Sequence, residues 1–144
     1  MRILGAWQFW ALLSASFAAL TAIFAKVGIE RVNSDFATLF RTIVILVVLT
    51  GIVVATGQWQ SPGSLNRRTV VFLILSGLAT GASWICYFRA LKIGEAARVA
   101  PIDKLSVVLV AIFGVLFLGE RLSRVNAIGV ALIALGAILV AVGA

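Results

Sequence analysis

Five long apolar stretches constrain the fold of this chain more than any other feature of its sequence. Each holds 18 to 22 residues, carries at most two charged residues, and is apolar along its length rather than at alternate positions. A helix needs about 20 apolar residues to cross the hydrocarbon layer of a membrane, whereas a barrel strand needs alternation. The sequence therefore predicts an all-α membrane protein with five transmembrane helices, at residues 6–25, 36–56, 70–91, 99–118 and 125–142.

The composition excludes soluble folds and most catalytic chemistry. Of the residues, 62% are hydrophobic and 12% are charged, whereas a soluble domain has roughly 25% charged residues. With 0 His and 1 Cys, a disulfide framework, a Cys/His zinc site and a histidine-based triad are excluded. Glu30, Glu95 and Glu120 lie outside the apolar stretches and are not paired for acid–base work. We therefore predict neither an enzyme nor a cofactor.

The segments between the stretches are too short to hold a folded domain, so we predict a single transmembrane domain over residues 1–144. The first stretch is long for the core of a cleaved signal peptide and is interpreted as a true span. The run SPGS at residues 61–64 is a turn signal. Ser34 or Asp35 is expected to cap the second helix.

The basic residues do not set one orientation clearly. The net charge is +7, but the Lys and Arg residues form no stripe, which argues against a nucleic-acid partner. The N-terminus and the second and fourth loops carry five basic residues, against four on the other side, or seven with those inside the spans. Orientation follows the Lys and Arg count of short loops. Two hypotheses stand: the chain inserts both ways and forms an antiparallel homodimer, or it takes one orientation.

Polar and aromatic side chains form stripes along two of the predicted helices. On the first helix, one face carries Trp10, Ser14, Phe17 and Thr21. On the third helix, neighbouring faces carry Ser76, Thr80, Ser83 and Tyr87, and Gly77, Gly81, Trp84 and Phe88. Such stripes either line a polar cavity or let helices pack closely. The glycines favour packing, whereas the bulk of Trp84 and Tyr87 favours a cavity.

Four charged residues inside the predicted helices lie towards the same membrane side: Arg41, Arg89, Asp103 and Lys104. We expect Arg89 to pair with Asp103 across the short third loop, which leaves Lys104 and Arg41 as unmatched positive charge. That charge favours an anionic or zwitterionic solute, with Lys104 as its main contact. Alternatively, the four form a structural ion-pair cluster at one end of the bundle, and Arg41 extends to the lipid headgroups.

Two further residues flank the fourth predicted helix. Pro101 removes a backbone donor and is either a first-turn proline or a kink that opens carbonyls to a cavity. Glu120 is expected to pair with Arg121 or Arg124, or to meet a neighbouring helix end. The candidate substrate-binding residues are Trp10, Ser14, Arg41, Ser76, Thr80, Ser83, Trp84, Tyr87, Arg89, Asp103 and Lys104.

The order and spacing of several short motifs resemble the EamA domain of the drug/metabolite transporter superfamily. The motifs are YFRAL at residues 87–91, GERL at residues 119–122 and the Ile128-Gly129 pair, and Arg41 matches a basic residue common in the family's second span. The resemblance covers residues 7 to about 139.

Members commonly have ten spans in two five-span halves, so the resemblance implies one half of an inverted-repeat transporter, of the short bacterial type that works as a dimer. Unlike four-span multidrug pumps, this chain has no glutamate in its first helix. Members often have a proline deeper in the fourth span, near the position of Val107, whereas this chain has Pro101 and the Asp103-Lys104 pair nearer the start of that span. The substrates of characterised relatives are therefore not carried over.

We therefore predict a multi-pass transporter of the bacterial inner membrane that moves a small polar metabolite or drug by alternating access, as a homodimer. Its partners are the lipid bilayer, an anionic or zwitterionic solute and a second copy of the chain. The alternative is a non-transporting accessory or scaffold subunit of a membrane complex, which the small size and the apolar fifth stretch favour.

Overall fold

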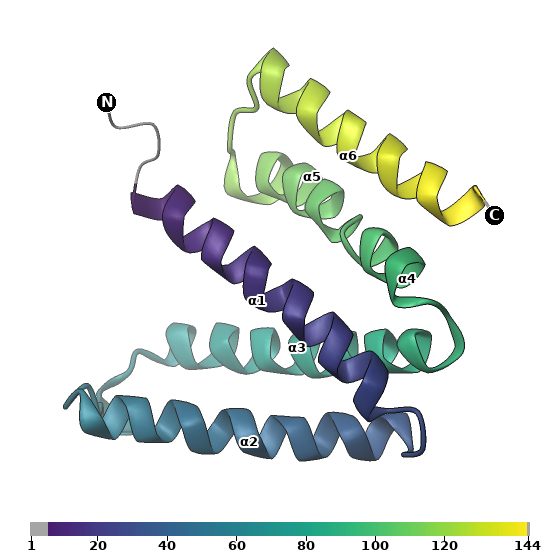
Figure 1. The fold of residues 1–144 in the computed structure, drawn as a ribbon. Coiled ribbons are helices and arrows are strands. Elements are labelled where there is room, and N and C mark those ends of the chain that lie inside the picture. The colour runs from purple at the N-terminus through teal and green to yellow at the C-terminus, as the bar shows by residue number, and fades with distance from the viewer. Residues whose placement is uncertain (1–5, 144) are drawn as a thin grey trace. The chain divides into compact units, whose positions relative to one another are not determined.

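The computed structural model describes residues 6–143, and all regular structure in that range is helical (Figure 1). The elements are α1 (Ala6–Gly28), α2 (Ser34–Ala55), η1 (Pro62–Ser64), α3 (Arg67–Ile93), α4 (Ala96–Asp103), α5 (Ser106–Leu118) and α6 (Arg124–Val142). Five segments are long and apolar enough to cross a membrane: α1, α2, α3, α4 together with α5, and α6. The prediction of an all-helical chain with five long apolar helices is confirmed.

The second helix begins with a cap that differs from the predicted one. The side-chain oxygen of Asn33 accepts hydrogen bonds from the backbone N–H groups of Asp35, at 2.8 Å, and Phe36, at 3.2 Å. An asparagine that satisfies two N–H groups of the first turn is an effective N-cap. The expectation that Ser34 or Asp35 caps this helix is therefore wrong. The predicted turn at residues 61–64 is confirmed, since η1 closes with a 2.9 Å bond from Ser64 N–H to Ser61 O.

The fourth span is broken between Asp103 and Ser106, a few residues after Pro101. Pro101 is the sixth residue of α4, which ends two residues later at Asp103. Because proline has no N–H, it cannot bond the carbonyl four residues earlier. At the break, Leu105 and Val107 bond carbonyls only three residues back, each at 3.0 Å. Pro101 is therefore a kink and not a first-turn proline.

The helices divide into two compact units, each described by itself. The hairpin unit, residues 25–92, holds the end of α1 and the antiparallel helices α2 and α3 (Figure 1). Its buried side chains gather where α1 ends, α2 begins and α3 ends: Ala25, Ile29, Thr38, Phe88 and Leu91. The α4–α6 unit, residues 6–24 and 93–143, holds most of α1 and packs α6 against α4 and α5.

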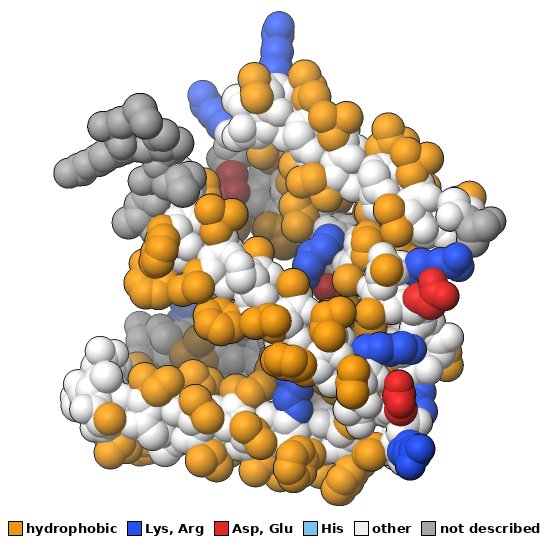
Figure 2. Space-filling view, viewed as in Figure 1, with side chains coloured by type: hydrophobic (Ala, Val, Ile, Leu, Met, Phe, Trp, Pro, Cys, Tyr) orange, Lys and Arg blue, Asp and Glu red, His pale blue; other side chains and the backbone are white. Residues whose placement is uncertain are grey.

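Large apolar side chains are exposed along every long helix, and they cover the helices in Figure 2. Phe117 on α5, for example, is 78% exposed, and Val54 on α2 is 61% exposed. A water-soluble protein rarely leaves large contiguous apolar surface uncovered. Exposure of this kind suits helices that have lipid tails as their solvent.

Candidate functional site

Two lysines join the ends of α1 and α3 by reciprocal contacts. The ammonium group of Lys92, in the last turn of α3, donates to the carbonyls of Ile29, at 2.7 Å, and Val32, at 2.5 Å, just after α1. In return, the ammonium group of Lys26, in the last turn of α1, donates to the carbonyl of Leu91 at 2.8 Å. Carbonyls at helix C-termini lack intrahelical partners and attract cations. These two basic residues therefore have a structural role at one end of the hairpin unit.

The carboxylate of Asp35 anchors the start of α2 to α3 through Arg89. The guanidinium of Arg89 donates from Nε at 2.9 Å and from Nη2 at 2.6 Å, one bond to each carboxylate oxygen. This two-pronged geometry is specific to arginine and a carboxylate. The predicted partner of Arg89 was Asp103, so that prediction is wrong. The structure thereby assigns Arg89 to a neutral pair at the end of the hairpin unit.

Arg41 lies further along the same hairpin and contacts aromatic rings. Its guanidinium carbon is 4.3 Å from the ring centroid of Trp84 and 5.2 Å from that of Phe88. A cation over an aromatic face is attracted by the ring's quadrupole. Arg41 follows Asp35 by six residues, so it lies about 9 Å further from the start of α2 at 1.5 Å per residue. The guanidinium lies over the Trp84 ring, and the interpretation that Arg41 extends to the headgroups stays a prediction.

No carboxylate within residues 25–92 forms an ion pair with Arg41, because Asp35 pairs with Arg89. A guanidinium has five N–H donors, all in the plane of the group. Stacking on the Trp84 ring covers one face of that plane and leaves its edge available. A carboxylate or phosphate group binds such an edge through two parallel hydrogen bonds. Arg41 with Trp84 and Phe88, which we call the Arg41 cluster, is therefore the candidate solute site.

The predicted stripes of α3 differ in what they face. Trp84 and Phe88 face Arg41 on α2, whereas Ser76, Thr80 and Ser83 are exposed. The hydroxyl of Thr80 donates to its own helix, at 2.9 Å from the carbonyl of Ser76. The Ser76, Thr80 and Ser83 side chains are therefore not brought to the Arg41 cluster.

The glycines of α3 are not in a close helix contact. A Cβ added at Gly77 or Gly81 would meet no described atom within 4 Å. The same holds for Gly129 and Gly136 on α6. Within its own unit, none of these glycines therefore lies at a close helix contact, and the expectation that they let helices pack closely stays a prediction. Gly81 lies one turn from Trp84, so there is unfilled room on the helix face that carries the ring.

Other predicted site residues stay apart from the Arg41 cluster or lie at its edge. Tyr87 is partly buried, with its ring centroid 6.4 Å from that of Phe88. Trp10 and Ser14 are exposed on α1, within the α4–α6 unit. The Trp10 ring lies 5.5 Å from the ring of Phe9. Their place in the site stays a prediction.

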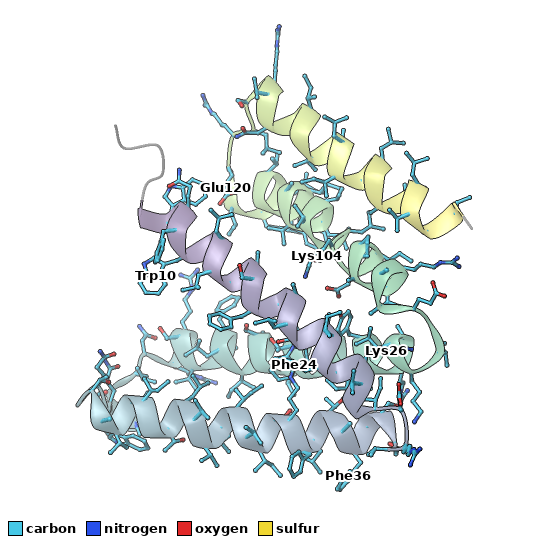
Figure 3. The ribbon with its side chains drawn as sticks, in the orientation of Figure 1. Trp10, Phe24, Lys26, Phe36, Lys104 and Glu120 are labelled. Carbon is cyan, nitrogen blue, oxygen red and sulfur yellow. The ribbon has the colours of Figure 1, made fainter. Side chains whose placement is uncertain are left out.

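Lys104 is paired with its neighbour at the break between α4 and α5 (Figure 3). Its ammonium nitrogen lies 3.3 Å from the carboxylate of Asp103. The expectation that Lys104 carries unmatched charge is therefore wrong, and Arg41 becomes the better anion contact. Near the end of α5, the Glu120 carboxylate lies against Gly114 (Figure 3). Within the described residues it forms no ion pair with Arg121 or Arg124, so the pairing alternative is wrong, whereas a contact with a neighbouring helix end stays a prediction.

Sequence reasoning missed the partners that define the hairpin. Asp35 was considered only as a cap, and Phe88 only as part of a stripe. A usable signal existed, because Asp35 and Arg41 are six residues apart while Trp84 and Arg89 are five apart. In two antiparallel helices, a register that brings Asp35 to Arg89 also brings Arg41 to Trp84, because the spacing along each helix is nearly equal.

The comparisons with known proteins agree with this architecture. The model of the EamA-like transporter family matches residues 5–142. The chain is 71% identical over 136 residues to a Sinorhizobium sp. protein named "Uncharacterized transporter in cobO 3′region", which covers 94% of this chain and 96% of that one. No solved structure matches the chain. A family match over nearly the whole length and five apolar helices leave one assignment: the chain is a multi-pass membrane protein of the EamA-like transporter family.

Proposed function

We propose that this protein transports a small polar solute that carries a carboxylate or phosphate group, and that Arg41 binds this group. The observation that carries the proposal is the guanidinium of Arg41, held 4.3 Å over Trp84 without an acidic partner in the hairpin unit. A charged side chain within a membrane span is costly, so it is retained where it has a function or a partner. Trp84 stabilises the cation without neutralising it, which keeps the positive charge available to a solute.

The neighbouring charges support an anion rather than a cation as the solute. Asp35, the acidic residue of α2, is bound to Arg89 on both oxygens. A cationic solute would therefore find no free carboxylate within α2 or α3. A zwitterion remains compatible, since the rings of Trp84 and Phe88 favour a cationic group nearby.

We propose further that two copies work together, in opposite orientations, by alternating access. An odd number of spans places the two termini on opposite membrane sides, so two inverted copies form the arrangement of an inverted-repeat transporter. The near balance of basic residues between the two sides, five against four, supports insertion both ways. The interruption of the fourth span between α4 and α5 supports the proposal, because discontinuous helices recur in such transporters.

Uptake into proteoliposomes tests the proposed substrate class. The panel holds radiolabelled small carboxylates and phosphate esters, with neutral polyols and organic cations as the other classes. We expect uptake of one or more anionic or zwitterionic compounds, and a loss of about 10- to 100-fold in Arg41→Gln, because a hydrogen bond to a charged group is worth roughly 1.5–3 kcal/mol.

Arg68→Gln is the matched control. Arg68 is another arginine near an aromatic ring, 5.9 Å from that of Phe72, but it lies in the first turn of α3. Uptake by this variant is expected to equal that of the unmodified protein. Uptake confined to neutral or cationic compounds, or equal losses in both variants, contradicts the proposed role of Arg41.

A further inference from the structure

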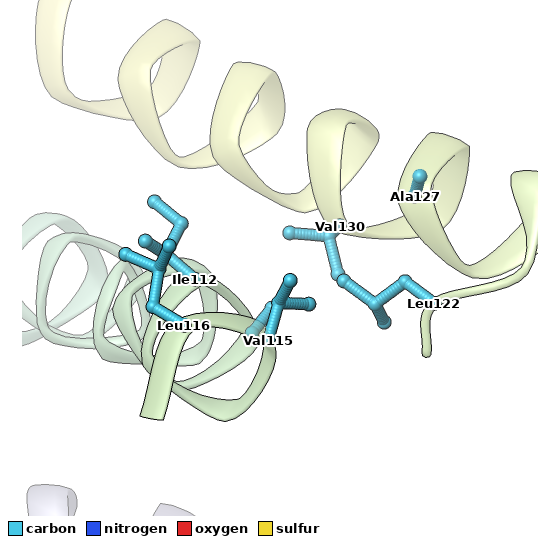
Figure 4. A pocket seen from close by; sticks show the side chains of 7 residues that line it. Ile112, Val115, Leu116, Leu122, Ala127 and Val130 are labelled. Atoms are coloured by element: carbon cyan, nitrogen blue, oxygen red, sulfur yellow. The ribbon is translucent and has the colours of Figure 1, made fainter. Parts of the chain in front are cut away.

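An apolar groove lies between α5 and α6, at the end where the two helices are joined (Figure 4). Its volume is about 340 Å³, within the range of roughly 300–1,000 Å³ that small-molecule sites occupy. All of its lining side chains are apolar: Ala111, Ile112, Val115 and Leu116 on α5, Leu122 in the connection, and Ala127 and Val130 on α6. Since both helices are membrane-spanning candidates, the groove faces lipid tails rather than water.

Two arginines lie in the chain next to Leu122, a lining residue of this groove. Arg121 and Arg124 flank Leu122, the lining residue of the connection, and both are exposed. Neither forms an ion pair within residues 93–143. Basic side chains project from the start of α6 in Figure 2. Because α5 ends and α6 begins here, the two guanidinium groups lie at the depth of the lipid headgroups.

The nearest carboxylate in the sequence is turned away from these arginines. The backbone N–H of Glu120 donates to the carbonyl of Gly114 at 3.0 Å, six residues back. Its side-chain oxygen lies 2.7 Å from the position that a Cβ on Gly114 would take. The carboxylate thus occupies the space over Gly114, and Arg121 and Arg124 keep their positive charge next to Leu122 in the chain.

We propose that the α5–α6 groove binds an acyl chain of an anionic phospholipid, and that Arg121 and Arg124 bind its phosphate. A phospholipid combines an apolar chain at tail depth with a negative group at headgroup depth, and the groove and arginines offer the complementary pair at the same two depths. Basic residues beside crevices between transmembrane helices are a recurrent lipid-binding arrangement. A second copy of the chain fits less well, because an apolar interface between copies would leave the two arginines without an anionic partner.

Native mass spectrometry of the full chain in detergent tests the proposal with two lipids that share the same tails, phosphatidylglycerol and phosphatidylcholine. We expect one tightly retained phosphatidylglycerol per chain and weaker retention of phosphatidylcholine. Loss of each arginine is expected to weaken phosphatidylglycerol binding about fivefold, the effect of roughly 1 kcal/mol per basic residue. Excess glycerol 3-phosphate is expected not to displace the lipid, because it lacks the acyl chain.

The charge control is the double variant Arg67→Gln/Arg68→Gln, compared with Arg121→Gln/Arg124→Gln. Both remove two arginines at or just before the start of a membrane-spanning helix, but only the second pair neighbours a lining residue of the α5–α6 groove. We expect selective loss only at the second pair. Equal retention in both double variants, equal retention of the two lipids, or displacement by glycerol 3-phosphate overturns the proposal.

A groove-filling variant tests the apolar half of the site. Ala127→Leu places three more carbon atoms in the groove, whereas Ala79→Leu adds the same atoms at an exposed position on α3. We expect Ala127→Leu to weaken retention of both lipids and Ala79→Leu to leave it unchanged. If Ala127→Leu instead separates dimers and leaves lipid retention unaltered, the groove is a contact between copies and the proposal fails.

Discussion

At the residue scale, Arg41 differs from the three basic side chains that tie the end of the hairpin unit together. Lys26, Lys92 and Arg89 each bind an oxygen of the protein itself, and these oxygens belong to the helix ends or to Asp35. Arg41 instead lies over the Trp84 ring. A ring stabilises a cation and leaves its N–H groups available. Among these four side chains, Arg41 is therefore the candidate for contact with a solute.

Arg41→Lys separates the charge of this side chain from its shape. Lysine keeps the positive charge but loses the planar edge that binds a carboxylate or phosphate through two parallel hydrogen bonds. We expect transport of the identified anion to fall less in Arg41→Lys than in Arg41→Gln, with a raised KM in initial-rate uptake. Equal rates for Arg41→Lys and the unmodified protein would show that only the charge matters.

A comparison of alanine substitutions at Gly114 and Gly136 tests the contact of the Glu120 carboxylate, because only Gly114 lies against it. A methyl group at Gly136 meets open space, so Gly136→Ala is expected to raise the free energy of unfolding by up to about 1 kcal/mol through helix propensity. Gly114→Ala is expected to gain less, because its methyl displaces the Glu120 carboxylate. Thermal unfolding in detergent gives the comparison.

The double variant Gly114→Ala/Glu120→Ala is the control for this displacement. It is expected to recover the gain seen at Gly136, since the clashing oxygen is gone. Additive effects of the two substitutions would contradict the contact between Gly114 and the Glu120 side chain.

At the scale of elements, helix ends organise this chain more than a packed core does. Asn33 caps α2, Lys92 binds the carbonyls after α1, and Lys26 binds a carbonyl at the end of α3. These contacts satisfy backbone groups that a helix terminus leaves unpaired. In lipid such groups are expensive to leave exposed. The hairpin unit is therefore held mainly at one end.

Lys92→Met tests that role. The substitution keeps the long apolar stem and removes the ammonium group that binds Ile29 and Val32 carbonyls. We expect the free energy of unfolding to fall by about 1–3 kcal/mol, measured by thermal unfolding in detergent. The control is Arg98→Met, which removes a cation from an exposed pair with Glu95 and is expected to change stability little. Equal stability of the two variants contradicts the capping role.

Pro101→Ala tests whether the break in the fourth span serves transport. Alanine restores a backbone donor, and a proline in a helix interior costs about 3 kcal/mol relative to alanine. We expect a continuous helix from residues 96 to 118, slower hydrogen exchange at residues 102–105, and slower transport. Faster or unchanged transport together with the slower exchange contradicts a working hinge.

At the scale of the whole molecule, the helices and the family could be predicted from the sequence, because lipid permits few kinds of backbone structure. Continuous apolar runs predicted five helices, and motif order predicted the EamA-like family. The helix caps and the partners of the charged side chains could not be predicted, because they depend on how neighbouring helices are aligned. The sequence pointed to Asp103 as the partner of Arg89, whereas the structure pairs Arg89 with Asp35 across the hairpin. Lys104 pairs with Asp103, so Arg41 replaces it as our candidate anion contact.

Dual orientation is also a property of the whole molecule. Reporter fusions at the C-terminus are expected to give signal on both sides of the membrane, because the basic residues are nearly balanced. Arg67→Gln/Arg68→Gln removes two charges from one side only. That variant is expected to place the C-terminus predominantly in the cytoplasm, on the side that then holds more Lys and Arg. Signal from one side alone in the unmodified protein contradicts the antiparallel pair.

The most direct test of the account is the fluorescence of Trp84, the ring that holds the proposed anion-binding guanidinium. In a chain with Trp7, Trp10 and Trp59 changed to Phe, Trp84 is the remaining tryptophan. Titration with the anion found in the uptake panel is expected to change its emission saturably, with no response in the same chain carrying Arg41→Gln. An identical response with and without Arg41, or transport of the anion with no change at Trp84, contradicts a solute site at this pair.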